Sequence, residues 1–292
     1  MNKTLFDRMY EFFRPQPPFW ACEFTSSQVV VAGVDSKRTK ILGRAAVDLP
    51  AGSLSGSLTE ANIRNPGVAQ PAVREGLERA GFKGFEIGLV IPDEAARISF
   101  LTAENLPSDP EELRTFIRWK LKKTVPFDVD TAQVAFRLID PSELLVALSP
   151  RSVIAEYENF MEGMGLHAGF VIPSTLAAMN LFHVPGEDTL FLKVAADCVT
   201  TTVFQNRRIR FYRRVTSASL YDAVYQTVLY YQDKLDGQAF SQMTVCAPDP
   251  AIRASMADLQ ERLNLRARRL EPVAIDDVFK PALGAVELSA AV

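Results

Sequence analysis

Two long stretches of the sequence repeat the same order of secondary-structure signals. Each starts with three strand-like runs joined by short polar turns, and each continues into an amphipathic helix and a short apolar strand. The first stretch begins near Trp20 and the second near Thr189. Between them, residues 98–168 read as strand, helix, strand, strand and helix. An internal duplication interrupted by an insertion predicts a two-lobed α/β protein.

The order of these elements predicts three units. We expect a first lobe at 1–97, an inserted α+β subdomain at 98–168, and a second lobe at 169–292 with a C-terminal helix that is a candidate to return to the first lobe. The strands of the two meanders are expected at 20–24, 29–33 and 40–47, and at 189–196, 200–205 and 209–214. The helices that follow are expected at 69–80 and 219–235, and the last helix at 275–284.

Composition excludes several classes of function. The 292 residues carry a net charge of −3, whereas a dedicated nucleic-acid binder is usually basic. Cys22, Cys198 and Cys246 lie far apart in apolar runs, and His167 and His183 have no cysteine or carboxylate at metal spacing. We therefore expect no metal site, no disulfide framework and no nucleic-acid partner. No apolar run reaches the roughly 18 residues that span a membrane, so we expect a cytoplasmic protein.

Two segments are candidates for contact with an anionic membrane surface or a partner. Residues 4–14 form a short amphipathic helix pattern rich in aromatic side chains, and we favour docking of this helix on its own domain. Residues 206–214 are the densest basic run. For this run we favour a solvated hairpin, with Asn206 and Arg207 in the turn and the arginines outward, over the binding of lipid headgroups.

Several short motifs in order resemble PilM, the actin-like protein of type IV pilus assembly, in the branch that also contains FtsA. The run ELRTFIRWKLKKTVPFDVDTAQVAFRL at 112–138 resembles the PilM helix with an "IRWE" core followed by "IPF" and a strand. The run GLHAGFVIPSTLAAMNLF at 165–182 looks like its crossover into the second half, and TVLYYQDKL at 227–235 looks like its "RSLDYY" helix. The resemblance implies the actin/hexokinase-like duplicated fold.

The resemblance also implies a nucleotide site between the two meanders, and this chain departs from that site. The first turn carries Glu23, Phe24, Thr25 and Ser26 where the family pattern has an acid, a glycine and small polar residues. Lys193 and Ala195 stand where the family has Asp and Gly in the second turn, and Ala247 and Pro248 replace its "GG" turn. The connection after residue 214 is also too short to hold the family's adenine-side subdomain. We expect a pseudo-ATPase with no cofactor.

The helix at 111–124 is the candidate partner-binding element. It has one apolar face and a basic face, which predicts a subdomain core on one side and solvent on the other. The resemblance implies that the groove between the first lobe and the insertion receives an N-terminal peptide of PilN, a single-pass membrane protein. The residues singled out for this contact are Phe116, Arg118, Trp119, Lys122 and Phe127, and their basic charge favours an acidic or carbonyl-rich partner.

The favoured function is therefore a cytoplasmic scaffold of a type IV pilus machine, held at the inner membrane through a PilN-like protein. One alternative is an active ATP-binding switch or ATPase. Another is the cytoplasmic domain of a GspL-type protein of type II secretion, which would be followed by a transmembrane helix. Because residues 290–292 close the sequence without such a helix, we favour the pilus interpretation. The sequence leaves the oligomeric state open.

Overall fold

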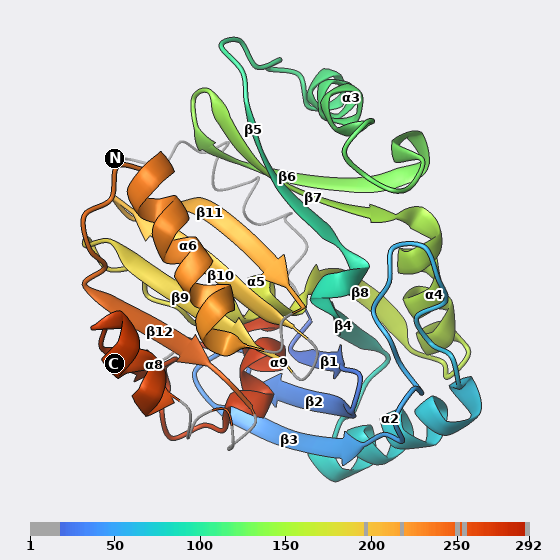
Figure 1. The fold of residues 1–292 in the computed structure, drawn as a ribbon. Coiled ribbons are helices and arrows are strands. Elements are labelled where there is room, and N and C mark those ends of the chain that lie inside the picture. The colour runs from blue at the N-terminus through green and yellow to red at the C-terminus, as the bar shows by residue number, and fades with distance from the viewer. Residues whose placement is uncertain (1–17, 196–197, 217–218, 249–251, 253–255, 290–292) are drawn as a thin grey trace.

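A computed structural model describes residues 18–195, 198–216, 219–248, 252 and 256–289, so the helix expected at 4–14 lies outside the described residues. The chain folds into two five-stranded sheets with the same strand order (Figure 1). The first has the order β3-β2-β1-β4-β8 and the second β11-β10-β9-β12-β13. In each, three antiparallel strands are followed by two parallel ones, which confirms the duplicated fold expected from the sequence.

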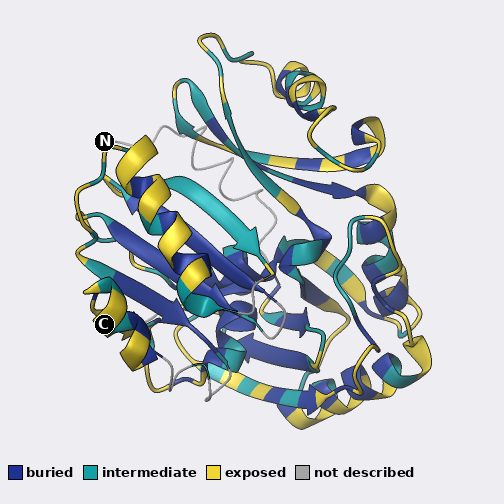
Figure 2. Cartoon of the chain, viewed as in Figure 1, coloured by how far each residue is buried: buried dark blue, intermediate teal, exposed yellow. Residues whose placement is uncertain are grey.

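The bounds of the six meander strands agree with the expected ranges to within two residues. The first sheet consists of β1 (Trp20–Phe24), β2 (Gln28–Val34), β3 (Ile41–Asp48), β4 (Glu86–Ile91) and β8 (His167–Pro173). The second consists of β9 (Thr189–Val194), β10 (Val199–Gln205), β11 (Arg208–Val215), β12 (Gln242–Cys246) and β13 (Ala267–Arg269). The central strands are buried on both faces (Figure 2), and in β2 this burial explains the nearly continuous apolar sequence.

Helices cover both faces of each sheet in equivalent positions. The outer helices are α2 (Pro66–Ala80) and α4 (Arg151–Glu162) on the first sheet, and α6 (Leu220–Lys234) and α8 (Met256–Leu263) on the second. Two short helices, α5 (Ser174–Met179) and α9 (Lys280–Ala285), share one hydrophobic cluster with the inner faces of both sheets. A Cβ on Gly284 would lie 2.1 Å from the carbonyl oxygen of Ala177, so only glycine allows α9 to approach α5 this closely.

The C-terminal helix α9 contacts β1, β2 and β4, so it does return to the first lobe. It is shorter than the range 275–284, because the 3₁₀ turn η3 (Asp277–Phe279) precedes it. β11 ends at Val215 and α6 begins at Leu220, which leaves no room for a subdomain between them. Among the described residues no helix is long and apolar enough to cross a membrane.

The inserted subdomain is a three-stranded sheet with one helix. It contains β5 (Arg97–Thr102), α3 (Pro110–Leu121), the 3₁₀ turn η2 (Val129–Thr131), β6 (Ala132–Asp140) and β7 (Glu143–Pro150), with the strand order β5-β7-β6. The Asp109 carboxylate accepts hydrogen bonds from the backbone N–H groups of Glu111 and Glu112, so it is the N-cap of α3. The helix stops at Leu121, one turn before the expected end near Thr124.

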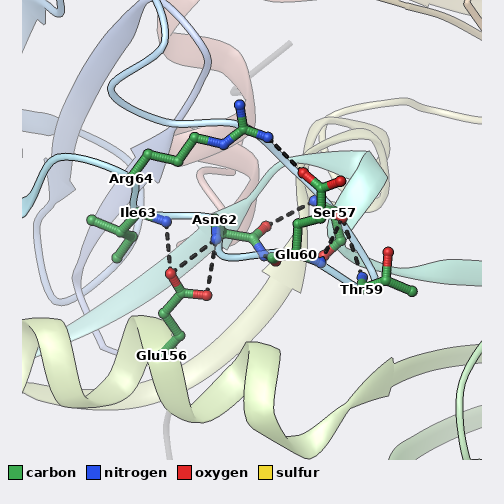
Figure 3. Close-up of polar contacts among 7 residues, drawn as sticks. All are labelled: Ser57, Thr59, Glu60, Asn62, Ile63, Arg64 and Glu156. Carbon is green, nitrogen blue, oxygen red and sulfur yellow. Dashed lines mark hydrogen bonds and ion pairs between the residues drawn. The ribbon is translucent and has the colours of Figure 1, made fainter.

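The packing places α4 and β8 in the first lobe, whereas the sequence order assigned residues 151–168, which include α4 and the start of β8, to the insertion. The buried side chains of α4, including Val153 and Tyr157, join the hydrophobic core of the first sheet. The Glu156 carboxylate accepts hydrogen bonds from the N–H groups of Asn62 and Ile63, with N···O distances of 2.7–3.0 Å, and so ties α4 to the loop before α2 (Figure 3). By packing, the insertion covers 97–150. The order of elements cannot distinguish the two assignments, because both sheets need an outer helix.

Candidate functional site

The cleft between the two lobes contains a cavity of about 610 Å³. Its walls come from the β1–β2 turn, the 3₁₀ turn η1 (Asp93–Ala95) and the start of α5 in the first lobe, and from β9 and the segment after β12 in the second. Of the nucleotide-site positions singled out in the sequence, seven line it: Glu23, Phe24, Thr25, Ser26, Lys193, Ala195 and Pro248. Ala247 lies beside the cavity and does not line it.

Asp93 lies in this cleft, although the sequence pattern assigned the adjacent acids Asp93 and Glu94 no role in a site. It lies directly beyond the carboxyl end of the parallel strand β4 and is only 4% exposed. Its carboxylate accepts hydrogen bonds from the backbone N–H of Thr175 at 2.8 Å, from the Thr175 hydroxyl at 2.5 Å and from the Thr200 hydroxyl at 3.5 Å. An acid that follows a buried parallel strand is a signal of a site at the sheet edge, and here it is readable in the sequence.

Glu23 is buried at the end of β1 and faces the same cavity. The Ser174 hydroxyl donates a hydrogen bond of 2.5 Å to its Oε1 atom. Burial raises the pKa of Glu23 from its ordinary value of 4.5 to about 7; nearby Lys193 and the Ser174 hydrogen bond oppose this rise, and Asp93 adds to it. The group therefore exchanges its proton near neutral pH.

Lys193 enters the cleft from β9 and is 5% exposed. Its Nζ atom lies 3.9 Å from Oδ2 of Asp93. Burial opposes the charged form of this ammonium, but the carboxylates of Asp93 and Glu23 hold its pKa above the ordinary value. The ammonium therefore remains protonated at physiological pH, between two acidic side chains of the other lobe.

The turn between β1 and β2 is closed by Thr25. Its hydroxyl oxygen accepts hydrogen bonds from the backbone N–H groups of Ser27 and Gln28, at 3.3 and 2.8 Å, and its hydroxyl donates to the carbonyl oxygen of Gln28. Two of the backbone donors of the turn are therefore satisfied within the turn itself.

A second buried charge cluster fixes the segment after β12. The Asp277 carboxylate accepts hydrogen bonds from the Ala247 N–H at 2.8 Å and from Arg269 at 2.7 Å, and it pairs with the buried ammonium of Lys280 at 2.7 Å. Lys280 also donates to the carbonyl oxygen of Leu270. The backbone donor of Ala247 therefore points to a carboxylate of the protein.

A second cavity of about 630 Å³ forms a groove between the first lobe and the insertion. One wall is the edge strand β8 with α5 and the end of α9, and the other is one face of the insertion sheet, including Gln133, Ala135 and Ala147. None of the five candidate partner residues, all within the described range 18–195, lines this groove. They belong to α3 and the segment after it, and α3 covers the opposite face of the insertion sheet (Figure 1).

The five candidate residues instead have other surroundings. Phe116 and Phe127 pack against the hydrophobic cluster of the insertion, and Arg118 donates a hydrogen bond to the carbonyl oxygen of Ala132. Lys122 pairs with Asp130 at 3.0 Å, and Trp119 is 68% exposed beside Phe116. The apolar face of α3 was foreseen correctly as a core face, but its basic face does not border the groove.

Comparisons with known proteins identify the fold. No family model and no curated protein matches the sequence. The structure is similar to a solved PilM–PilN type IV pilus biogenesis complex, with a TM-score of 0.76 at 14% identity over 94% of this chain and 100% of that chain. It is also similar to a Bacteroides thetaiotaomicron protein with an actin-like ATPase fold, with a TM-score of 0.60 at 9% identity over 89% and 93% of the two chains. This chain has an actin-like ATPase fold.

The resemblance to PilM that the short motifs suggested is thereby confirmed at the level of the fold. A further similar structure is the cytoplasmic domain of EpsL, an inner membrane component of the type II secretion system of Vibrio cholerae. It matches with a TM-score of 0.55 at 12% identity, over 80% of this chain and 83% of that chain. Identities this low show a common architecture and leave the function to be argued from this chain's own residues.

The actin-like fold implies a magnesium–nucleotide complex in the cleft, and the residues present do not fit one. A volume of about 610 Å³ is within the usual range for a small-molecule site, so the mismatch is chemical. The Lys193 ammonium already lies beside the carboxylate that a metal ion would need. Backbone donors that could hold phosphate oxygens are bonded to Thr25 and Asp277 instead.

The sequence favoured arginines of β11 that all point into solvent. In the structure three of them form ion pairs instead. Asn206 and Arg207 do form the turn, with positive φ angles of 51° and 62°. Arg208 pairs with Asp140, and Arg210 pairs with Glu143 at 3.0 Å, so the actin-like second lobe is fastened to the insertion. Arg214 pairs with Glu94 at 3.0 Å across the cleft. The outward orientation was the wrong interpretation because the partner acids are distant in sequence.

Proposed function

We propose that this chain is a non-hydrolysing adaptor that binds an extended peptide of a membrane protein in the groove between the first lobe and the insertion. The observation that carries the proposal is the edge of β8. Five consecutive residues of this strand, 169–173, line the groove. Side chains of a strand alternate between its faces, so consecutive lining residues mean that the backbone edge itself borders the cavity.

The edge of β8 that borders the groove can offer main-chain hydrogen bonds to a partner. β8 pairs with β4 on one side, and no other strand of the described residues pairs with it. Unpaired N–H and C=O groups along an edge bind an added strand, and proteins normally cover or blunt such edges. A peptide in extended conformation would satisfy these groups.

The opposite wall has room for the side chains of such a peptide. Its residues include Ala135 and Ala147, which are small, whereas Val134 and Val146 on the other face of the same strands pack against α3. Valines of these strands thus face the core of the insertion, whereas the two alanines face the groove beside Gln133. This arrangement leaves pockets for alternate side chains of the ligand.

The charges at the groove indicate which peptide it takes. Glu86 and Glu287 line it, and neither side-chain carboxylate has an ion pair or hydrogen bond with the described part of the chain. The remaining lining is mainly apolar, including Ile91, Val171 and Leu176. A peptide with an apolar middle and basic flanks complements this groove, in place of the acidic partner expected from α3. Lys and Arg are enriched on the cytoplasmic flanks of membrane-spanning helices.

The similar solved structures support a place in pilus assembly or secretion. One is a complex of PilM with PilN, and another is the cytoplasmic domain of an inner membrane secretion component. We infer that the chain acts in the cytoplasm as a scaffold of a type IV pilus machine, at the inner membrane through a PilN-like partner. The mismatch at the cleft supports a pseudo-ATPase, with the type II secretion role as the alternative.

The experiment is a fluorescence anisotropy titration with the cytoplasmic N-terminal peptide of a PilN-like protein from the same organism. We expect Ala135→Trp, which fills the groove from an exposed position, to weaken binding at least about tenfold. Ala257→Trp is the matched control, because this exposed alanine lies on α8 of the other lobe. Equal affinity for both variants and the wild type would remove the groove from the proposal.

Exchanging the charges of the groove and of the peptide ends tests the predicted basic flanks without a natural peptide. Two synthetic ten-residue peptides with the same alternating apolar middle would carry lysines or glutamates at both ends. We expect the wild type to prefer the lysine peptide and the double variant Glu86→Lys/Glu287→Lys to prefer the glutamate peptide. Reversal of Arg118 and Lys122 to glutamate should leave the preference unchanged, because α3 lies outside the groove. An unchanged preference in the first double variant would contradict the assignment.

A further inference from the structure

Three ionisable side chains from both lobes meet in the base of the cleft. Glu23 and Asp93 belong to the first lobe, and Lys193 belongs to the second. All three are at most 5% exposed and line the same cavity. Two buried carboxylates in one site repel each other and lose hydration, so the site needs a cation or a proton.

The protein supplies this cation from its own chain. The Nζ atom of Lys193 lies 3.9 Å from Asp93, and no hydrogen bond joins the ammonium to the described part of the chain. The carboxylates have hydrogen-bond donors of their own, Ser174 for Glu23 and Thr175 for Asp93. The ammonium therefore acts mainly by its charge, as a metal ion would act toward the same carboxylates, and less through directed hydrogen bonds.

A second cation from the same lobe fastens the neighbouring residue. Arg214 of β11 pairs with Glu94, which follows Asp93 in η1. Two cations of the second lobe therefore pair with two adjacent acids of the first lobe. The Lys193–Asp93 pair is buried and the Arg214–Glu94 pair is partly exposed. Cys198 also lines this cavity and is 4% exposed, so its accessibility reports whether the cleft is closed.

We propose that Lys193 is a tethered counter-ion that takes the place of a divalent cation in the cleft and holds the two lobes together without metal or nucleotide. On this basis the wild-type cleft has no affinity for divalent cations, and removal of the ammonium exposes a latent site. The two carboxylates, with the hydroxyl groups of Ser174 and Thr175 behind them, offer the oxygen ligands that hard cations prefer.

The experiment compares the wild type with Lys193→Ala, using Mn²⁺ alone as the probe. Calorimetry should show no Mn²⁺ binding to the wild type at about 1 mM and binding at least about tenfold tighter to the variant. Without metal, alkylation of Cys198 should be about tenfold faster in the variant, and Mn²⁺ should restore protection. Cys22 is buried in the core of the first sheet and does not line the cavity, so it serves as an internal reference. Lys122→Ala, which removes a surface ammonium paired with Asp130, should behave as the wild type.

Two results would overturn the proposal. One is Mn²⁺ binding of equal strength in the wild type and Lys193→Ala. The other is a variant that folds, keeps Cys198 protected and ignores Mn²⁺. If the Lys193→Ala variant fails to fold, reductive methylation of the lysines in the wild type tests the proposal instead. Lys193 must then be protected while Lys122, 62% exposed, reacts, and Mn²⁺ must restore folding of the variant. Equal methylation of the two lysines, or a variant that Mn²⁺ does not restore, would contradict the proposal.

Discussion

Replacing Glu23 with glutamine should change how the stability of this protein depends on pH. The pKa of Glu23 is about 7 in the folded state and 4.5 as its ordinary value, mainly because the carboxyl group is buried. Below pH 4.5 the Glu23 carboxyl group is protonated in both the folded and the unfolded state, so its ionisation does not change the free energy of unfolding. Between pH 4.5 and 7 the unfolded chain releases the proton first, so stability falls as pH rises through this window. One pKa unit corresponds to about 1.4 kcal/mol, so above pH 7 the burial of Glu23 lowers the free energy of unfolding by about 3 kcal/mol.

Glutamine keeps the acceptor for the Ser174 hydroxyl and removes the titration. We therefore expect Glu23→Gln to gain stability relative to the wild type as pH rises from 4.5 to 8, by up to about 3 kcal/mol. Urea unfolding at a series of pH values, followed by tryptophan fluorescence, measures this difference. Glu75→Gln is the control, because its exposed ion pair with Arg79 on α2 contributes little. If the curves of Glu23→Gln and the wild type run parallel across this range, the assignment of the titrating group is refuted.

Three further results are expected. Asp277→Asn should cost about 3–5 kcal/mol in urea unfolding, because it leaves the buried ammonium of Lys280 without an anion. Despite burial, hydrogen bonds from Lys280, Ala247 and Arg269 hold the pKa of Asp277 below its ordinary value of 3.8, so its contribution should be lost only as pH falls below about 4. Gly284→Ala should cost about 1–3 kcal/mol, since the added Cβ meets a backbone carbonyl of α5, and a neutral effect would contradict the close approach. Mg-ATP at about 1 mM should leave the melting temperature unchanged, whereas a site with a Kd of about 10 µM would add about 2.7 kcal/mol.

Local signals in the sequence were sufficient for the duplicated fold. β1 has the expected bounds, Trp20–Phe24, because short apolar runs between turn residues depend on nearby residues alone. The turn at Asn206 and Arg207, which the sequence predicted, follows from equally local chemistry. The departures at Lys193 and Pro248 are also visible as substitutions in short motifs.

Contacts between distant segments decided the rest. Lys193 is 100 residues from Asp93 in sequence, and the acids that pair with the arginines of β11 lie in the insertion and in η1. The packing of α4 on the first sheet and the position of α3 away from the groove depend on the same long-range arrangement. An amphipathic pattern specifies which face of a helix is buried and leaves open which surface covers it. Ion pairs and grooves between lobes form only when the sheets pack, so their partners were determined by tertiary structure.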